Sequence, residues 1–104
     1  MANQPNILVI MVDELAPQAL SCYGHPVVKS PNIDRLANSG VVFDNAYCNS
    51  PLCTPSRASF MSGQLCPNIN AYDNGAEFPA AVPTIAHFMR SVGYDTTLCG
   101  KMHF

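Results

Sequence analysis

The sequence is poor in charged residues and has no basic cluster. Its 104 residues include 5 Lys and Arg and 7 Asp and Glu, for a net charge of −2 at pH 7. The basic residues are scattered along the chain: Lys29, Arg35, Arg57, Arg90 and Lys101. Nucleic-acid binding and recruitment to an anionic membrane both depend on clustered positive charge. We therefore expect neither a nucleic acid nor a membrane as a partner.

Long apolar runs are missing as well. The stretch Ile7 to Val12 is entirely apolar but far too short to span a bilayer. It has no cationic lead-in and no small-residue cleavage site after it, so it does not have the pattern of a signal peptide. The cytoplasm is therefore the expected compartment.

The cysteines lack the spacing of a metal or redox motif. There are five, an odd number, and no two of them form a C-x-x-C pair. Four are expected to be mostly buried free thiols that pack as small apolar side chains: Cys22, Cys48, Cys66 and Cys99. Cys53 is treated separately because of its neighbours.

What the sequence does contain is an alternation of apolar runs and helical patterns, with 48% hydrophobic residues. The runs 6–13, 41–47 and 94–99 are typical of strands, and the first is apolar enough to be buried on both faces. Helices are predicted over 30–37, up to Gly40, and over 55–62 and 83–92. This order predicts an α/β fold with a parallel sheet.

Three short strands would leave exposed edges and too small a core for a complete domain. We therefore expect residues 1–104 to be the N-terminal part of a single, larger catalytic domain, or one chain of a nicked protein.

Polar residues follow each predicted strand. Asp13 and Glu14 come directly after the first, 53–57 follows the second after a short loop, and Lys101 and His103 follow the third. In open parallel sheets, ligands bind outside the carboxyl ends of the strands. These three groups are therefore predicted to meet at one edge of the sheet.

The segment Cys53-Thr54-Pro55-Ser56-Arg57 has the features of a helix start. Pro55 suits a first turn, which places Cys53 at the N-terminus, where free backbone N–H groups and the helix dipole stabilise an anion. Arg57 is four residues on, on the same face, and its planar fork suits an oxyanion. By spacing alone, a buried Cys and a surface Arg that are neighbours by chance explain the pattern equally well.

Four segments, in this order, resemble the sulfatase family of the alkaline-phosphatase-like superfamily. They are 6–13, 30–37, the C-x-P-S-R motif at Cys53 with its continuation to Gly63, and 93–103. The resemblance covers essentially the whole chain. It implies an alkaline-phosphatase-like fold, mainly a parallel sheet flanked by helices. The segments 72–78 and 100–104 are most similar to the choline-sulfatase branch.

The resemblance also implies a mechanism for hydrolysing a sulfate ester. A maturation enzyme would oxidise Cys53 to formylglycine, whose hydrated aldehyde attacks sulfur and expels an alcohol. Loss of a proton from the second hydroxyl then releases sulfate. Arg57 would stabilise the hydrated aldehyde, and Lys101 would bridge it to a sulfate oxygen. His103 would take part in the proton step, or else be a structural histidine.

A divalent metal belongs to the same implied site. Ca²⁺, or else Mn²⁺ or Mg²⁺, would hold the sulfate and lower the pKa of the attacking hydroxyl. Asp13 and residue 53 match metal ligands. Family members often carry a second Asp where this chain has Glu14, which either binds through its longer arm or points elsewhere.

Substrate contacts are implied for Lys101 and Asn74. Asn74 matches a position that faces the substrate in choline-sulfatase-like enzymes, but Asp73-Asn74-Gly75 is also a strong turn sequence. The expected partner is a small sulfate ester, choline sulfate or a similar alkyl or aryl sulfate. Two alternatives stay open: a phosphonate monoester or phosphodiester hydrolase of the same superfamily, and an inactive fragment that needs a partner chain, either the remainder of its own chain or a second copy.

Overall fold

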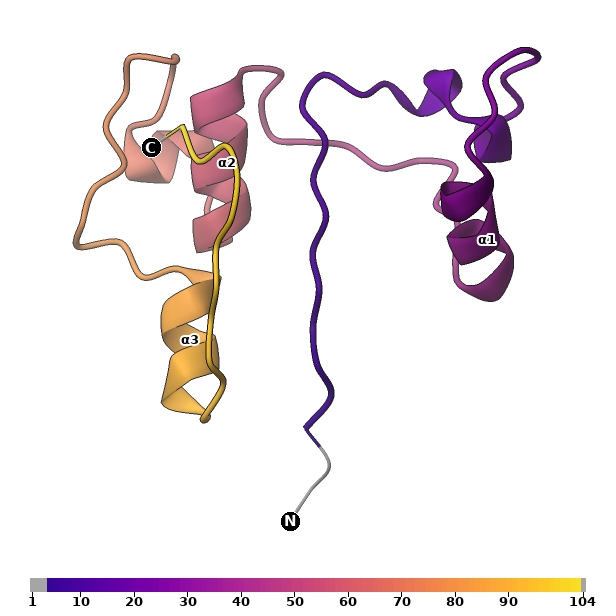
Figure 1. Ribbon diagram of the computed structural model, residues 1–104. Helices are drawn as coiled ribbons and strands as arrows, with labels where there is room; N and C mark the ends of the chain where they lie inside the picture. Colours follow the sequence, from indigo (N-terminus) through magenta and orange to yellow (C-terminus); the bar gives the residue numbers. More distant parts are fainter. Residues whose placement is uncertain (1–3, 104) are drawn as a thin grey trace. The chain divides into compact units, whose positions relative to one another are not determined.

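The computed structural model of the protein describes residues 4–103 and divides into two compact units (Figure 1). The first ends at Asn45 and the second begins at Ala46. Within the described range, regular structure consists of α-helices and short 3-10 helices, and none of these helices has the length and apolar character needed to cross a membrane.

The first unit contains two 3-10 turns, η1 (Pro17–Ala19) and η2 (Ser21–Tyr23), and the helix α1 (Pro31–Ser39). The predicted helix over 30–37 is confirmed, and it continues to Ser39 before Gly40. Pro31 starts the helix because its fixed φ suits the first turn. Proline has no backbone N–H, and at this position an N–H would have no acceptor within the helix. Ser30 is the N-cap residue, but its hydroxyl does not cap the helix.

The Ser30 hydroxyl instead joins a polar network that connects α1 to η2. Ser21 Oγ donates to Asp34 Oδ2 at 2.7 Å, and Ser30 Oγ donates to Asp34 Oδ1 at 3.2 Å. The Ser30 N–H donates to Ser21 Oγ at 2.9 Å. One carboxylate and two hydroxyls therefore hold the start of α1 against a segment nine residues earlier.

The second unit contains α2 (Cys53–Ser62), the 3-10 turn η3 (Cys66–Ile69) and α3 (Ile85–Ser91). Its core is a small cluster of Ala58, Ile69 and Ala71, each at most 1% exposed, with Ala76, Phe78 and Val82 packed against it. The methyl side chain of Ala58 lets η3 approach α2 closely. Gly63 ends α2 in the left-handed conformation, at φ 68°, where a side chain would be strained.

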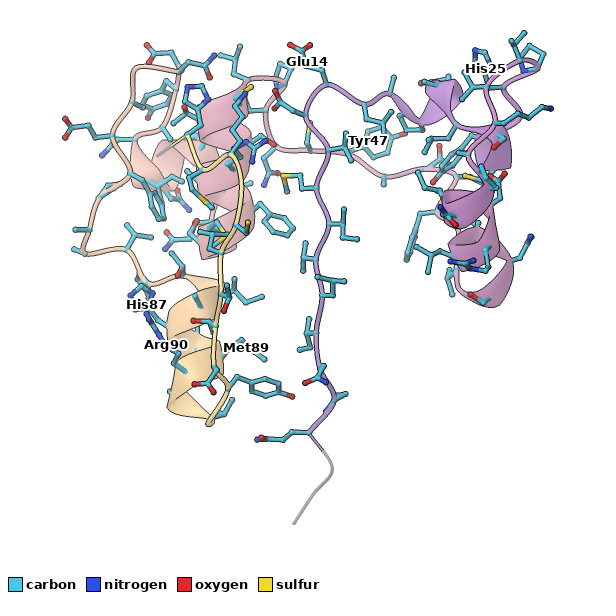
Figure 2. The ribbon with its side chains drawn as sticks, viewed as in Figure 1. Glu14, His25, Tyr47, His87, Met89 and Arg90 are labelled. Carbon is cyan, nitrogen blue, oxygen red and sulfur yellow. The ribbon has the colours of Figure 1, made fainter. Side chains whose placement is uncertain are left out.

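Both helices of this unit were predicted, with small shifts in their bounds. α2 begins at Cys53 instead of residue 55, and α3 is shorter than the predicted range 83–92. Thr84 and His87 form a reciprocal capping box at the start of α3, in which the Thr84 N–H donates to His87 Nδ1 at 3.1 Å. Figure 2 labels His87 on this helix. The positions of proline and glycine do not predict such a cap, because the cap depends on side-chain geometry.

The three predicted strands are not observed among residues 4–103. A strand is defined by hydrogen bonds to a neighbour, and these segments do not form such a ladder with one another. Residues 4–12 run as an extended trace (Figure 1), and Leu8 is 82% exposed. The α/β class with a parallel sheet therefore stays a prediction.

The prediction for the cysteines is wrong in part. All five are free thiols, but only Cys66 is buried, whereas Cys48 and Cys99 are exposed. Cys66 is covered because η3 packs on α2. Cys48 and Cys99 lie in segments outside the helices, where no packed element covers them.

Candidate active site

The first turn of α2 carries the residue expected to be the nucleophile. Cys53 is the first residue of the helix, after Leu52 in an extended conformation, and is half-buried. The Nζ atom of Lys101 lies 3.7 Å from Cys53 Sγ, although 48 residues separate them. The structure therefore brings together two of the four predicted catalytic residues side chain to side chain.

Arg57 lies one turn further along α2 and reaches the same segment. Its guanidinium donates from an Nη atom to the carbonyl oxygen of Lys101 at 2.8 Å. Lys101 is thus in contact with α2 twice, through its amine at Cys53 and through its carbonyl at Arg57. Cys53 and Arg57 are both in α2, four residues apart, as predicted, and the Lys101 amine is the positive group that lies 3.7 Å from Cys53 Sγ.

Thr54 was not selected from the sequence, yet it has several partners in the site. It is 1% exposed, and its Oγ1 donates to the carbonyl oxygen of His103 at 3.0 Å. The same oxygen lies 3.5 Å from the Asn74 carbonyl oxygen, and the Thr54 N–H donates to Asn74 Oδ1 at 3.0 Å. Its only sequence signal is its place inside the motif, because its partners are mostly backbone atoms.

The segment 100–103 reaches α2 with two left-handed residues. Gly100 has φ 97° and His103 has φ 59°. A positive φ is ordinary for glycine but uncommon for a histidine, so the contacts around His103 must hold it. The structure places the His103 carbonyl on Thr54 and leaves the residue exposed. A proton-transfer role for its imidazole stays a prediction.

Asn74 lies in the turn that its sequence predicts. The Gly75 N–H donates to Asp73 Oδ1 at 2.8 Å, which closes the turn. The side chain of Asn74 reaches the start of α2, where its oxygen binds the Thr54 N–H. A role of Asn74 in substrate binding stays a prediction. Its hydrogen bond with Thr54 was not expected from the sequence.

The same contact changes the expected source of anion binding. Free N–H groups were expected at the start of α2, but the Thr54 N–H already donates to Asn74 and Pro55 has none to offer. The ammonium of Lys101 and the guanidinium of Arg57 are therefore the groups near Cys53 best suited to a sulfate oxygen.

The carboxylates expected to bind a metal lie in the first unit. Asp13 and Glu14 form a turn after the extended segment, with Glu14 at φ 58° (Figure 2). Carboxylate oxygens suit a hard cation such as Ca²⁺, which takes about six to eight oxygen ligands. Within residues 4–103, no three His, Cys, Asp or Glu side chains gather as a metal site. The pair fits a metal in chemistry, and its role as metal ligands stays a prediction.

Comparison with known proteins identifies the family. The sulfatase family model matches residues 5–104. The chain belongs to the sulfatase family. It is 48% identical over 102 residues to the choline-sulfatase of Rhizobium meliloti (strain 1021), covering 98% of this chain and 20% of that protein. It is 38% identical over 101 residues to the N-acetylglucosamine-6-O-sulfatase of Bacteroides thetaiotaomicron, covering 97% of this chain and 18% of that protein.

The fold of this sulfatase chain also matches a solved sulfatase structure. A 2-O GAG sulfatase superposes with a TM-score of 0.90 at 35% identity, over 97% of this chain and 23% of that one. The chain spans about a fifth of the length of the curated relatives that it matches. The family resemblance of the four sequence segments is thereby confirmed.

Proposed function

We propose that the protein is a sulfuric ester hydrolase that cleaves a small sulfate monoester, with choline sulfate as the first candidate. The observation that carries the proposal is the 3.7 Å approach of Lys101 Nζ to Cys53 Sγ on the first turn of α2, inside an intact C-T-P-S-R motif. Membership of the sulfatase family supports the same reaction class.

Each residue of the site has a proposed task. Cys53, once oxidised to formylglycine by a maturation enzyme, supplies a hydrated aldehyde whose hydroxyl is the nucleophile. Lys101 holds a sulfate oxygen beside residue 53, because an ammonium donates charge-assisted hydrogen bonds. Arg57 adds a second positive charge and holds the Lys101 backbone. The imidazole of His103 moves a proton during release of sulfate.

A divalent metal is part of the proposal, with Asp13 as a ligand from this chain and Glu14 either as a second ligand or pointing elsewhere. When bound, the metal would neutralise charge on the sulfate oxygens and make the sulfur easier to attack. Ca²⁺ is the first candidate, since two adjacent carboxylates offer the hard oxygen ligands that it prefers.

Choline sulfate is proposed from similarity to one relative. Identity to the choline-sulfatase is 48%, against 38% to the N-acetylglucosamine-6-O-sulfatase. A quaternary ammonium carries charge but no hydrogen-bond donor, so its pocket needs aromatic faces and carboxylates. The charged groups proposed to bind the sulfate, such as Lys101 and Arg57, are of a different kind from the aromatic and acidic groups that a choline pocket needs. Sulfate cleavage and selection of the alcohol can therefore be tested separately.

The test compares specificity constants of the full-length enzyme for choline sulfate, an aryl sulfate and a phosphate diester. Peptide mass spectrometry across residue 53 reports its conversion in the same sample. We expect formylglycine and the highest kcat/KM with choline sulfate. A preference for the aryl ester would replace the substrate and keep the reaction class, whereas a preference for the phosphate diester would replace the reaction class.

A further inference from the structure

We infer that Thr54 is a positioning residue, which holds the segment Lys101 to His103 on α2 and so sets the Lys101 amine at residue 53. The inference deepens the proposed function and rests on it. Thr54 itself is buried and contacts no reacting atom in the proposed mechanism, so it acts through Lys101.

Thr54 joins three parts of the chain that are distant in sequence. Its own backbone belongs to the first turn of α2, its N–H binds Asn74 Oδ1 twenty residues on, and its hydroxyl binds the His103 carbonyl forty-nine residues on. At 1% exposure these groups have no access to solvent, so a lost partner is not replaced by bulk water. A single residue thereby fixes the turn at Asn74 and the segment at His103 to the same helical turn.

The length of the side chain explains why Thr54 and not Arg57 sets the position. Arg57 also binds this segment, at the Lys101 carbonyl, but through a long side chain with many rotamers. In Thr54 a single torsion, χ1, separates the hydroxyl from the helix backbone, as it would in serine, so the helix leaves the hydroxyl few positions. Its bond to the His103 carbonyl also stabilises the left-handed conformation of that residue, at φ 59°.

Loss of the hydroxyl should affect turnover more than binding. A misplacement of about 1 Å in a positioned group can lower a rate by about a hundredfold. If Lys101 acts on charge that develops in the transition state, its misplacement lowers kcat and changes KM little. We expect a 10- to 100-fold loss of kcat, by order of magnitude, with KM within about threefold.

The experiment compares Thr54→Val, Thr54→Ser and Thr84→Val in the full-length enzyme. Valine keeps the shape of threonine and removes the hydroxyl, whereas serine keeps the hydroxyl. Thr84 is the matched control, because it is also buried, at 8% exposure, and its hydroxyl binds His87 on α3 and not the site. Formylglycine content is measured for each variant by mass spectrometry, and rates are expressed per converted molecule, since Thr54 adjoins Cys53.

The expected pattern is a large loss of kcat in Thr54→Val, near-parent kcat in Thr54→Ser, and near-parent kcat in Thr84→Val. Amide hydrogen exchange over residues 101–103 should be faster in Thr54→Val and unchanged in Thr84→Val. If Thr54→Val does not fold, Thr54→Ala takes its place in the comparison.

Parent-like kcat in Thr54→Val, or an equal loss in Thr54→Ser, would overturn the positioning role and leave the sulfatase function intact. A parent enzyme with no turnover of any sulfate ester would overturn the proposed function. The exchange measurement then still decides whether Thr54 holds the segment, since unchanged exchange in Thr54→Val would overturn that part independently.

Discussion

The two units of the chain are stabilised by different kinds of contact. In the second unit, Ala58, Ile69 and Ala71 form a fully buried cluster between α2 and η3. In the first unit, none of the described residues is buried, and the contact between η2 and α1 depends on hydrogen bonds around Asp34. One unit therefore has an apolar core of its own, and the other has a polar network in its place.

This difference shows where a precise site can be built. α2 carries Ala58 in the core and Cys53 and Arg57 near its start, so the core that fixes the helix also fixes the candidate catalytic residues. Asp13 and Glu14 instead follow an apolar segment with exposed side chains. The two carboxylates of the first unit therefore lie at the end of a segment whose side chains are exposed to solvent within this chain.

Cys53→Ala is expected to have the largest effect. Removal of the proposed nucleophile should lower kcat by at least about a thousandfold, because the remaining contacts cannot form the covalent intermediate. The measurement is turnover of a sulfate ester by the full-length enzyme. Cys48→Ala is the matched control, since Cys48 is an exposed free thiol of the same unit, and it should keep parent activity. Near-parent turnover in Cys53→Ala would rule out the mechanism.

Asp13→Ala tests the chemical role of the first unit. It should lower kcat/KM by about a hundredfold or more and reduce the metal bound per protein, since a carboxylate ligand is lost. Metal content is measured by elemental analysis and folding by circular dichroism. Asp44→Ala, an exposed carboxylate of the same unit, should change neither quantity. A metal-replete, active Asp13→Ala enzyme would falsify the ligand assignment.

Ile69→Ala tests the core of the second unit. Ile69 is 1% exposed, and its truncation should lower the free energy of unfolding by about 2–5 kcal/mol. Denaturant unfolding of the full-length protein gives the value. An effect within about 0.5 kcal/mol, typical of a surface change, would mean that this cluster is not a core.

Denaturant unfolding of Ile10→Ala tests whether the apolar segment of the first unit is also buried in the full-length protein. Ile10 is 73% exposed within this chain. If residues 6–13 are a strand of a parallel sheet in the full-length protein, the sheet and its flanking helices bury this side chain. We then expect a loss of similar size to that of Ile69→Ala. A loss below about 0.5 kcal/mol would contradict the predicted sheet at this position.

Asp34→Ala should have the smallest effect of the set. It removes the acceptor shared by Ser21 and Ser30, and hydrogen bonds to a charged group contribute about 1.5–3 kcal/mol. Because Asp34 is half-buried, we expect a loss near the lower end of this range. Asp44→Ala is again the control. A double-mutant cycle with Ser21→Ala should show a coupling above about 0.5 kcal/mol, and additive effects would argue against the network.

Local signals made the helices predictable. Helix α1 begins at Pro31 and ends just before Gly40. In α2, Pro55 marks the first turn and Gly63 the end. Prolines and glycines give such local signals because they act through their own backbone angles. The strands at 6–13, 41–47 and 94–99 could not be confirmed in the same way. A strand needs a partner, and its partner is not a local property.

The same distinction, between local signals and contacts of distant segments, applies to the candidate site. The sequence by itself determined that Cys53 and Arg57 share a helical face, since four residues make about one turn. The approach of Lys101 to Cys53 was expected from the ends of the predicted strands and from the family resemblance, whereas the tertiary structure alone decided the contacts of Thr54. Its partners are a carbonyl at His103 and an amide at Asn74, and which distant backbone atoms reach a buried hydroxyl is decided by packing, which residue spacing does not encode.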